Sequence, residues 1–160
     1  MKTLISIEEI KSTTLNENVE DKFILDAIST VQSLQLQQLI GSELLTKLLD
    51  GIDETGAFTL NDDYYNLIIN YIQPYLKKQV QASLIIPLNY KLRNAGLVTN
   101  TDNNFSIVGY KEAKSVEQYL SDEASAFADL LTKYLSANSA KFPEYKCKNT
   151  INNTIIYFGL

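Results

Sequence analysis

Residues 64–85 carry an apolar side chain at nearly every third or fourth position, and this spacing constrains the fold more than any other feature of the chain. Such spacing places the apolar side chains on one face of an α-helix. We predict a long helix over residues 62–94, kinked or divided because Pro74 and Pro87 each remove a hydrogen-bond donor. Its predicted apolar face comprises Tyr64, Leu67, Ile68, Tyr71, Ile72, Tyr75, Leu76, Val80, Leu84 and Ile85.

Both ends of this predicted helix carry helix-boundary signals. Thr59 or Asn61 can cap the N-terminus, and Asp62 and Asp63 lie in the first turn, where the helix dipole favours acidic side chains. Gly96 suits the position just after the last turn, where a left-handed backbone conformation ends many helices. These signals predict that the helix begins near residue 62 and ends before Gly96.

A second amphipathic pattern covers residues 110–138 and predicts a helix of about seven turns. The sequence SAKFPEYKCKN, with Pro143, should end it. The predicted apolar face comprises Ala113, Val116, Tyr119, Leu120, Ala124, Phe127, Leu130, Leu131, Tyr134 and Leu135.

The N-terminal region predicts shorter helices. Ser6 and Glu9 have the spacing of a capping box, which predicts a short helix over residues 7–11. Gly41 should end or kink the next helix, and Ser42 can cap the one that follows. The helix before Gly41 has a predicted apolar face of Phe23, Ala27, Ile28, Val31, Leu34 and Leu39.

Residues 97–109 interrupt the helical pattern between the two strongest predicted helices. A polar, Asn-rich tip, TNTDNN, is flanked by two short apolar pieces, LV and FSIV. This pattern is typical of a β-hairpin with a loose turn. We predict a hairpin or extended loop at about 97–109 that projects from the helices and contacts a neighbouring molecule. An ordinary surface hairpin is the equal alternative.

The last eight residues, NTIIYFGL, are β-branched and aromatic, and they predict a strand rather than a helix. A lone apolar strand needs a partner, because unpaired backbone groups and half-exposed apolar side chains are costly. The partner could be the FSIVG piece, another chain or the helical core. We therefore predict one helical domain over residues 1–145 and an extended C-terminal tail over residues 146–160.

Composition argues against several kinds of chemistry. The 160 residues include no His and one Cys, so the commonest general base, the commonest zinc ligand and any cysteine metal cluster are missing. The sequence has no Gly-rich phosphate loop and no nucleophile elbow, and its adjacent acids suit capping or solvated positions. We predict that the protein is not an enzyme and has no cofactor and no metal site.

Charge and hydropathy narrow the partners. A net charge of −5 with a single Arg is poorly suited to gripping nucleic acid by its phosphates. The N-terminus lacks the apolar stretch of a signal peptide, and no apolar run reaches the length of a membrane span. These observations predict an intracellular protein with no membrane partner. Its ten Tyr side chains suit a core as well as interfaces.

Several stretches together give the chain a resemblance to a known family. The segments TLISIEEIKS, LIGSELLTKLL, IQPYL and NYKLRNAGLV follow one another in this order. In sequence and order they resemble the head–tail connector (adaptor) proteins of tailed bacteriophages, of the type found in crAss-like and other Bacteroidetes phages. The similarity covers roughly residues 3–145 and does not extend to NTIIYFGL.

The resemblance implies a mainly α fold, a helical bundle of four to five helices with a projecting hairpin or extended loop. Members of that family form rings, typically dodecamers, that lie below the portal protein, bridge capsid and tail, and line the channel through which DNA passes without specific binding. It therefore implies a structural virion protein, made in the bacterial host cytoplasm. Its partners would be copies of itself, the portal protein and/or another connector or tail protein.

Two functions remain open at this point. A ring-forming connector should place certain apolar residues in contacts between chains. These interface residues are Phe105, Ile107, Phe142, Tyr145, Ile155, Ile156, Tyr157 and Phe158. The alternative is a small helical protein–protein interaction module, for example a dimer, with no role in a virion. In that case the same aromatic side chains should pack within one protomer.

Overall fold

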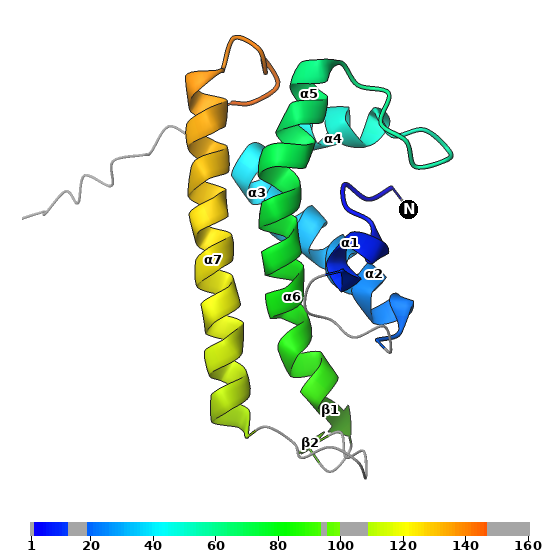
Figure 1. Cartoon of the computed structure of the whole chain (residues 1–160), viewed down its shortest axis with the longest axis vertical. Coiled ribbons are helices and arrows are strands. Elements are labelled where there is room, and N and C mark those ends of the chain that lie inside the picture. The colour runs from blue at the N-terminus through cyan, green and yellow to red at the C-terminus, as the bar shows by residue number, and fades with distance from the viewer. Residues whose placement is uncertain (1, 13–18, 94–95, 100–108, 147–160) are drawn as a thin grey trace, which may run out of the picture.

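The protein's computed structural model describes residues 2–12, 19–93, 96–99 and 109–146. Where helical segments follow one another without a break they form one helix, and the described residues then contain five (Figure 1). The prediction of a mainly α fold, a helical bundle, is confirmed. The helical segments are α1 (Ile7–Lys11), α2 (Asp21–Thr30), the π-helical η1 (Val31–Leu36), α3 (Gln37–Ile40), α4 (Ser42–Asp50), α5 (Asp62–Leu67), the π-helical η2 (Ile68–Ile72), α6 (Gln73–Asn89) and α7 (Tyr110–Ala137).

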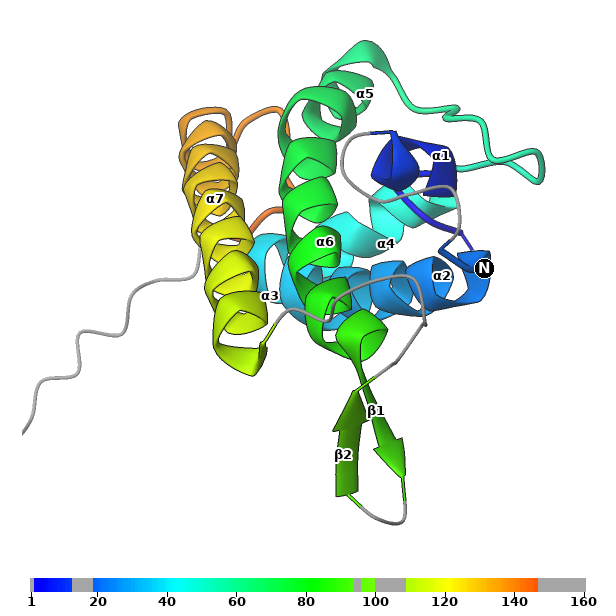
Figure 2. The ribbon, with the colours of Figure 1, turned by 60° about the horizontal axis from the view of Figure 1, so that its bottom comes forward.

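Helix α6 lies at the centre of the bundle. It contacts α7 along one side and α1 and α2 on the other, and Figures 1 and 2 show α7 and α2 on opposite sides of it. The chain runs along α6 and returns along α7, so these two long helices are antiparallel. This arrangement leaves the outer face of α7 without a neighbouring helix among the described residues.

Local signals set most helix ends. The capping box is confirmed, because the Ser6 hydroxyl accepts from the Glu9 amide and the Glu9 carboxylate accepts from the Ser6 amide. Asn61 caps α5 through its side-chain oxygen, as one of the two predicted candidates. Gly41 ends α3 with a φ of 85°. The predicted Ser42 cap is wrong, because Gly41 occupies that position and Ser42 is the first residue of α4.

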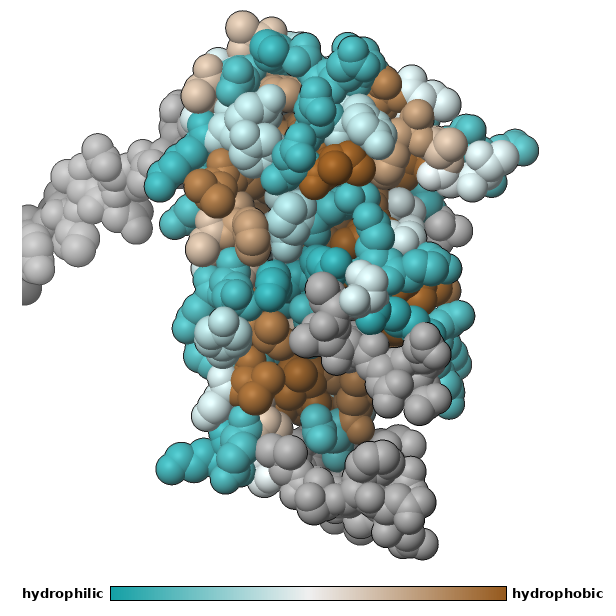
Figure 3. All heavy atoms as spheres, viewed as in Figure 1, coloured by the Kyte–Doolittle hydropathy of each residue, from teal (hydrophilic) through white to brown (hydrophobic). Residues whose placement is uncertain are grey.

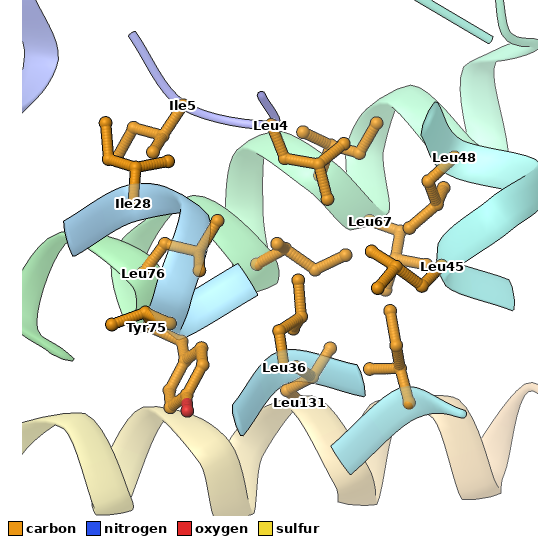
Figure 4. Close-up of a cluster of buried hydrophobic side chains, with 14 of the residues drawn as sticks. Leu4, Ile5, Ile28, Leu36, Leu45, Leu48, Leu67, Tyr75, Leu76 and Leu131 are labelled. Carbon is orange, nitrogen blue, oxygen red and sulfur yellow. The ribbon is translucent and has the colours of Figure 1, made fainter. Parts of the chain in front are cut away.

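The core forms where the helices meet. Side chains from the N-terminal segment, α2, α4, α5, α6 and α7 converge in one cluster, in which Figure 4 labels Leu4, Ile28, Leu48, Leu67 and Leu131. The apolar face predicted for residues 64–85 is confirmed, since all of its members are buried except the half-buried Tyr71 and Ile85. Hydrophobic spacing alone was therefore enough to orient this helix.

The apolar face predicted for the helix before Gly41 is partly wrong. The buried side chains there are Ile24, Ile28, Val31, Leu36 and Ile40, whereas Phe23 and Leu34 are exposed. The buried positions step by five residues from Val31 to Leu36, and this step coincides with η1. A π-helical turn adds a residue to the turn and shifts every later side chain around the helix. The prediction assumed a uniform period of 3.6 residues.

The second π-helical turn, η2, ends directly before Gln73 and Pro74. A proline ring inside a regular α-helix would clash with the carbonyl four residues earlier, here that of Asn70. The wider turn accommodates the ring and lets the helix continue as α6. Pro87 lies inside the last turn of α6, which ends at Asn89. The predicted kink or division thus takes the form of a π-helical turn and an early helix end.

Two glutamines beside these π-helical turns hold the N-terminal segment on the bundle. The Gln32 side chain is buried, its Oε1 accepts from the Leu4 amide at 2.9 Å, and its Nε2 donates to the Lys2 carbonyl at 3.2 Å. The Gln73 Nε2 donates to the Leu4 carbonyl at 3.0 Å. Both polar groups of the Leu4 backbone are thereby satisfied by side chains, and the Leu4 side chain can fill the core.

The segment between α6 and α7 differs from the prediction. Strands β1 (Tyr90–Arg93) and β2 (Gly96–Thr99) pair antiparallel, with Leu92 opposite Leu97 (Figure 2). The predicted continuation of the helix to residue 94 and the role of Gly96 as its cap are therefore wrong. The LV piece pairs with the preceding strand rather than with FSIV. Residues 100–108, and with them the second half of the predicted hairpin, lie outside the described residues.

Candidate assembly surface

Helix α7 buries only a narrow row of side chains. The row comprises Ala113, Leu120, Ala124, Leu131 and Leu135, at steps of seven and four residues, and it belongs to the side of α7 that packs against the bundle. Steps of seven and four correspond to two turns and one turn of an α-helix, so all five lie along one line. The remaining apolar residues predicted for this face need a separate account.

Three large apolar side chains of α7 lie outside that row and are exposed. The exposed fractions are 48% for Val116, 63% for Tyr119 and 53% for Leu130. They are three and eleven residues apart, close to one and three turns, so they lie along one flank of the helix. We call these three residues the α7 stripe. All three were predicted to be buried, and that prediction is wrong.

The α7 stripe borders a closed junction between α6 and α7. Tyr134 stacks on Tyr71 with ring centroids 4.0 Å apart, and the Lys78 ammonium pairs with the Glu123 carboxylate at 2.9 Å. Hydrophobic atoms reach the surface along this junction, between hydrophilic ones (Figure 3). Isolated exposed apolar side chains are common on proteins, but an aligned row of them is a feature of interaction sites.

A second exposed apolar pair lies on the opposite side of α6. Phe23 of α2 is 41% exposed and Leu34 of η1 is 60% exposed. Phe23 and Ala27 border a hollow of about 210 Å³, together with Leu84 and Pro87 of α6. The described part of the protein thus exposes apolar side chains on two sides, one formed by α7 and one by α2 and η1.

Residues 141–146, which follow α7, fold back onto α4 and α5, and we call them the clasp. Phe142 is completely buried, and its ring meets the Tyr64 ring edge-on, with centroids 5.2 Å apart and planes at 84°. Edge-to-face geometry places the positive edge of one ring against the negative face of the other. Tyr134 of α7 lies against the same Phe142 ring, with centroids 6.0 Å apart.

Polar contacts surround this aromatic cluster. The Tyr64 hydroxyl donates to the Glu144 carboxylate at 2.7 Å, and the Lys47 ammonium lies 3.5 Å from the same carboxylate. Two further lysines of the clasp pair with acids of the bundle, Lys141 with Asp63 at 2.8 Å and Lys146 with Glu43. These last two pairs are exposed and add little stability, so Phe142 and Tyr64 carry most of the contact.

The environment of these groups shifts their pKa values. Burial, followed by the hydrogen bond to Glu144, raises the pKa of Tyr64 to about 12, and burial raises the pKa of Tyr75 to about 12 as well. The hydrogen bond from Tyr64 holds the pKa of Glu144 below its ordinary value. At neutral pH both hydroxyls are therefore protonated donors, and Glu144 is an ionised acceptor.

These shifts predict a loss of stability in alkali. An unfolded tyrosine loses its proton near pH 10, whereas Tyr64 and Tyr75 in the folded protein keep theirs to about pH 12. The folded state then binds more protons than the unfolded state, so the free energy of unfolding falls between pH 10 and 12, by up to about 1.4 kcal/mol per pH unit for each tyrosine. Urea unfolding at pH 9, 10 and 11 measures this slope. Tyr75→Phe should make it shallower, and an unchanged slope in that variant would contradict the assignment.

Most residues predicted for the interface lie outside the described part of the chain. These are Phe105, Ile107, Ile155, Ile156, Tyr157 and Phe158. Phe142 is buried within its own protomer and exposes no surface to a partner, so we do not retain it as an interface residue. Tyr145 is half-buried and packs against the core. The exposed residues Val116, Tyr119 and Leu130 were missed because their spacing also fits a buried face.

The described residues also include polar clusters and hollows. No three or more His, Cys, Asp or Glu side chains among them are grouped as metal ligands would be. A hollow of about 310 Å³ lies between the N-terminal segment and the loop over residues 52–58. Its Asp53 carboxylate accepts from the Thr55 hydroxyl and from the Thr55 and Ala57 amides, and the Thr55 hydroxyl bond is the main reason why its pKa is lowered. These contacts serve the turn itself.

Comparisons with known proteins give one match. A family model described as a family of unknown function (DUF6712) matches residues 36–155, three quarters of the 160-residue chain. This range begins at the end of η1 and includes α3 to α7, the clasp and the α7 stripe. No curated protein and no solved structure matches the chain. Within the described residues, no helix is long and apolar enough to cross a membrane.

Proposed function

Because this chain belongs to DUF6712, a family of unknown function, we propose its function from its own surface: it is a structural protein that assembles with copies of itself. The specific assembly that we propose is the head–tail connector of a tailed bacteriophage. There it forms a ring below the portal protein, bridges capsid and tail, and surrounds the DNA channel. The protein acts without catalysis or a cofactor.

The observation that carries this proposal is the α7 stripe. Val116, Tyr119 and Leu130 are about half exposed or more, although they lie on a helix whose other flank is well packed. Exposing them to water is unfavourable, at roughly 25 cal/mol per Å² of apolar surface, so a contact that covers them is favoured. Tyrosine at the centre of such a row is typical of residues that dominate binding energy.

The two exposed sides of the protomer support a ring. The stripe lies on α7, and the second pair, Phe23 and Leu34, lies on the opposite side of α6. A contact between two different surfaces of identical subunits repeats from copy to copy, and it produces a closed ring when the rotation closes. The resemblance of residues 3–145 to phage connector proteins supplies the virion context for such a ring.

Other parts of the proposed interface come from the sequence alone. We propose that Phe105 and Ile107, which follow the β1–β2 pair, and the C-terminal residues 155–158 contact a neighbouring subunit or the portal protein. Tyr145 lies where the clasp leads into that C-terminal segment. Partners beyond the ring are the portal protein, another connector or a tail protein.

The mass of the assembled protein tests this function. We expect light scattering and native mass spectrometry to find a large ring, at many times the 18.0 kDa mass of one chain. The double substitution Tyr119→Ser with Leu130→Ser should abolish it, because it removes the apolar surface that the contact covers. A matched control, Lys111→Ser with Ser125→Ala, changes exposed α7 residues outside the stripe and should leave the ring intact.

Two results would decide against the proposal. A strict dimer that persists at high concentration would support the alternative, a small helical interaction module without a virion role. A ring that survives the Tyr119 and Leu130 substitutions would show that the α7 stripe is not the contact surface. Circular dichroism of each variant establishes that the helices are still folded.

A further inference from the structure

We propose that in the free subunit the C-terminal segment, residues 147–160, packs on the α7 stripe of its own chain and covers it. The α7 stripe is the surface with unpartnered apolar side chains nearest in sequence to this segment. The segment contains Ile155, Ile156, Tyr157 and Phe158, four consecutive large apolar residues. Each of the two surfaces lowers its exposure to water by packing on the other.

The clasp fixes where this segment begins. Phe142 is locked against Tyr64 and Tyr134, and Lys146 pairs with Glu43, so residue 147 starts near the C-terminal end of α7. Because the start is held, the segment does not search freely. Its effective concentration at the α7 surface is that of a short tether, in the millimolar range, which favours contact within one chain over contact between dilute chains.

The length of the segment matches the distance that it must cover. Val116 lies 21 residues before Ala137, the end of α7, which corresponds to about 32 Å along the helix. Phe158 lies 12 residues after Lys146, and an extended chain of that length spans about 40 Å. The apolar residues can therefore reach Tyr119 and Val116 while Lys148 is still beside the end of α7.

The charges beside the stripe agree with this occupant. Asp122 and Asp129 of α7 are exposed, two turns apart, on the outer side of the stripe. The segment 147–160 contains one Lys, Lys148, and no acid. A neutral to positive apolar segment can lie along this flank without repulsion, whereas an acidic partner could not.

The inference deepens the proposed function and rests on it in one respect. If the α7 stripe is the contact between subunits, its cover must leave before a neighbour can pack there. Free subunits would then stay apart until the cover is displaced. The contact between segment and stripe can be tested independently of whether a ring forms.

A disulfide trap on the monomer tests the inference. In a Cys147→Ser background, the pair Val116→Cys and Phe158→Cys should form a disulfide under mild oxidation, in the monomer fraction and within one chain. The control pair Ser125→Cys and Phe158→Cys, with Ser125 on a different face of α7, should not. A disulfide that forms only between chains would overturn the inference and favour a second copy as the occupant. Equal trapping in both pairs, or none in either, would also overturn it.

Thiol accessibility gives a second measurement that needs no disulfide. Val116→Cys in the Cys147→Ser background should react with a maleimide several-fold more slowly in the full chain than after deletion of residues 151–160. Ser125→Cys should react equally in both. Equal rates for the Val116→Cys pair would refute the cover. If the cover is confirmed and no ring forms under any condition, the proposed function fails while this inference stands.

Discussion

Replacing Phe142 with alanine should lower the free energy of unfolding by about 3–5 kcal/mol, the usual cost of removing a buried aromatic ring. Phe142 has no exposed surface, and its ring contacts Tyr64 and Tyr134 from two different helices. The substitution leaves a cavity and also removes an edge-to-face contact. Since small domains are stable by about 5–15 kcal/mol, this is a large share of the total.

Urea unfolding followed by circular dichroism measures this effect, with Leu130→Ala as the control. Leu130 is an exposed leucine on α7, so its truncation should change the free energy of unfolding by about 0.5 kcal/mol or less in the monomer. Equal small effects for both variants would show that Phe142 does not anchor the clasp. That result would return Phe142 to the set of interface residues expected from the sequence.

Replacing Gln32 with methionine is the second substitution with a large expected effect. Methionine has a similar length but cannot accept from the Leu4 amide or donate to the Lys2 carbonyl. The buried Leu4 amide then has no partner, at a cost of about 1–3 kcal/mol. Loss of this hold on the N-terminal segment should also loosen Leu4 and Ile5, which are both buried in the core.

Hydrogen exchange at the Leu4 amide gives a direct measurement, because this amide should exchange much faster in the Gln32→Met variant than in the unmodified protein. Gln38→Met is the matched control, since Gln38 is an exposed residue of α3 and its substitution should leave both exchange and stability unchanged. If the Leu4 amide stays protected in Gln32→Met, the glutamine does not hold the N-terminal segment.

The sequence predicted the helices well and their rotation less well. The face of residues 64–85 was predicted correctly because the buried positions keep a regular spacing through η2. The face before Gly41 was shifted because η1 inserts a π-helical turn, for which the residues Val31–Leu36 contain no proline or other local cue. The end of α6 was missed because Pro87, rather than Gly96, lies near the true end of the helix.

The candidate assembly surface was the least predictable part of the structure. Tyr119 and Leu130 fit a buried face as well as Leu120 and Leu131 do, because adjacent residues differ by only 100° around a helix. Which of them is buried depends on the rotation of α7 against α6. The interface residues expected from the sequence lie mostly outside the described residues, and Phe142 proved to be buried within the protomer.

Local chemistry in the sequence was enough to determine where several helices begin and end, as at Ser6, Gly41 and Asn61. Each of these signals acts over three or four residues through a single hydrogen bond or one backbone angle. Only the tertiary structure decided which flank of α7 faces water, and that Gln32 reaches the backbone of Leu4. Those outcomes depend on how helices far apart in the sequence pack, and no local pattern encodes that packing.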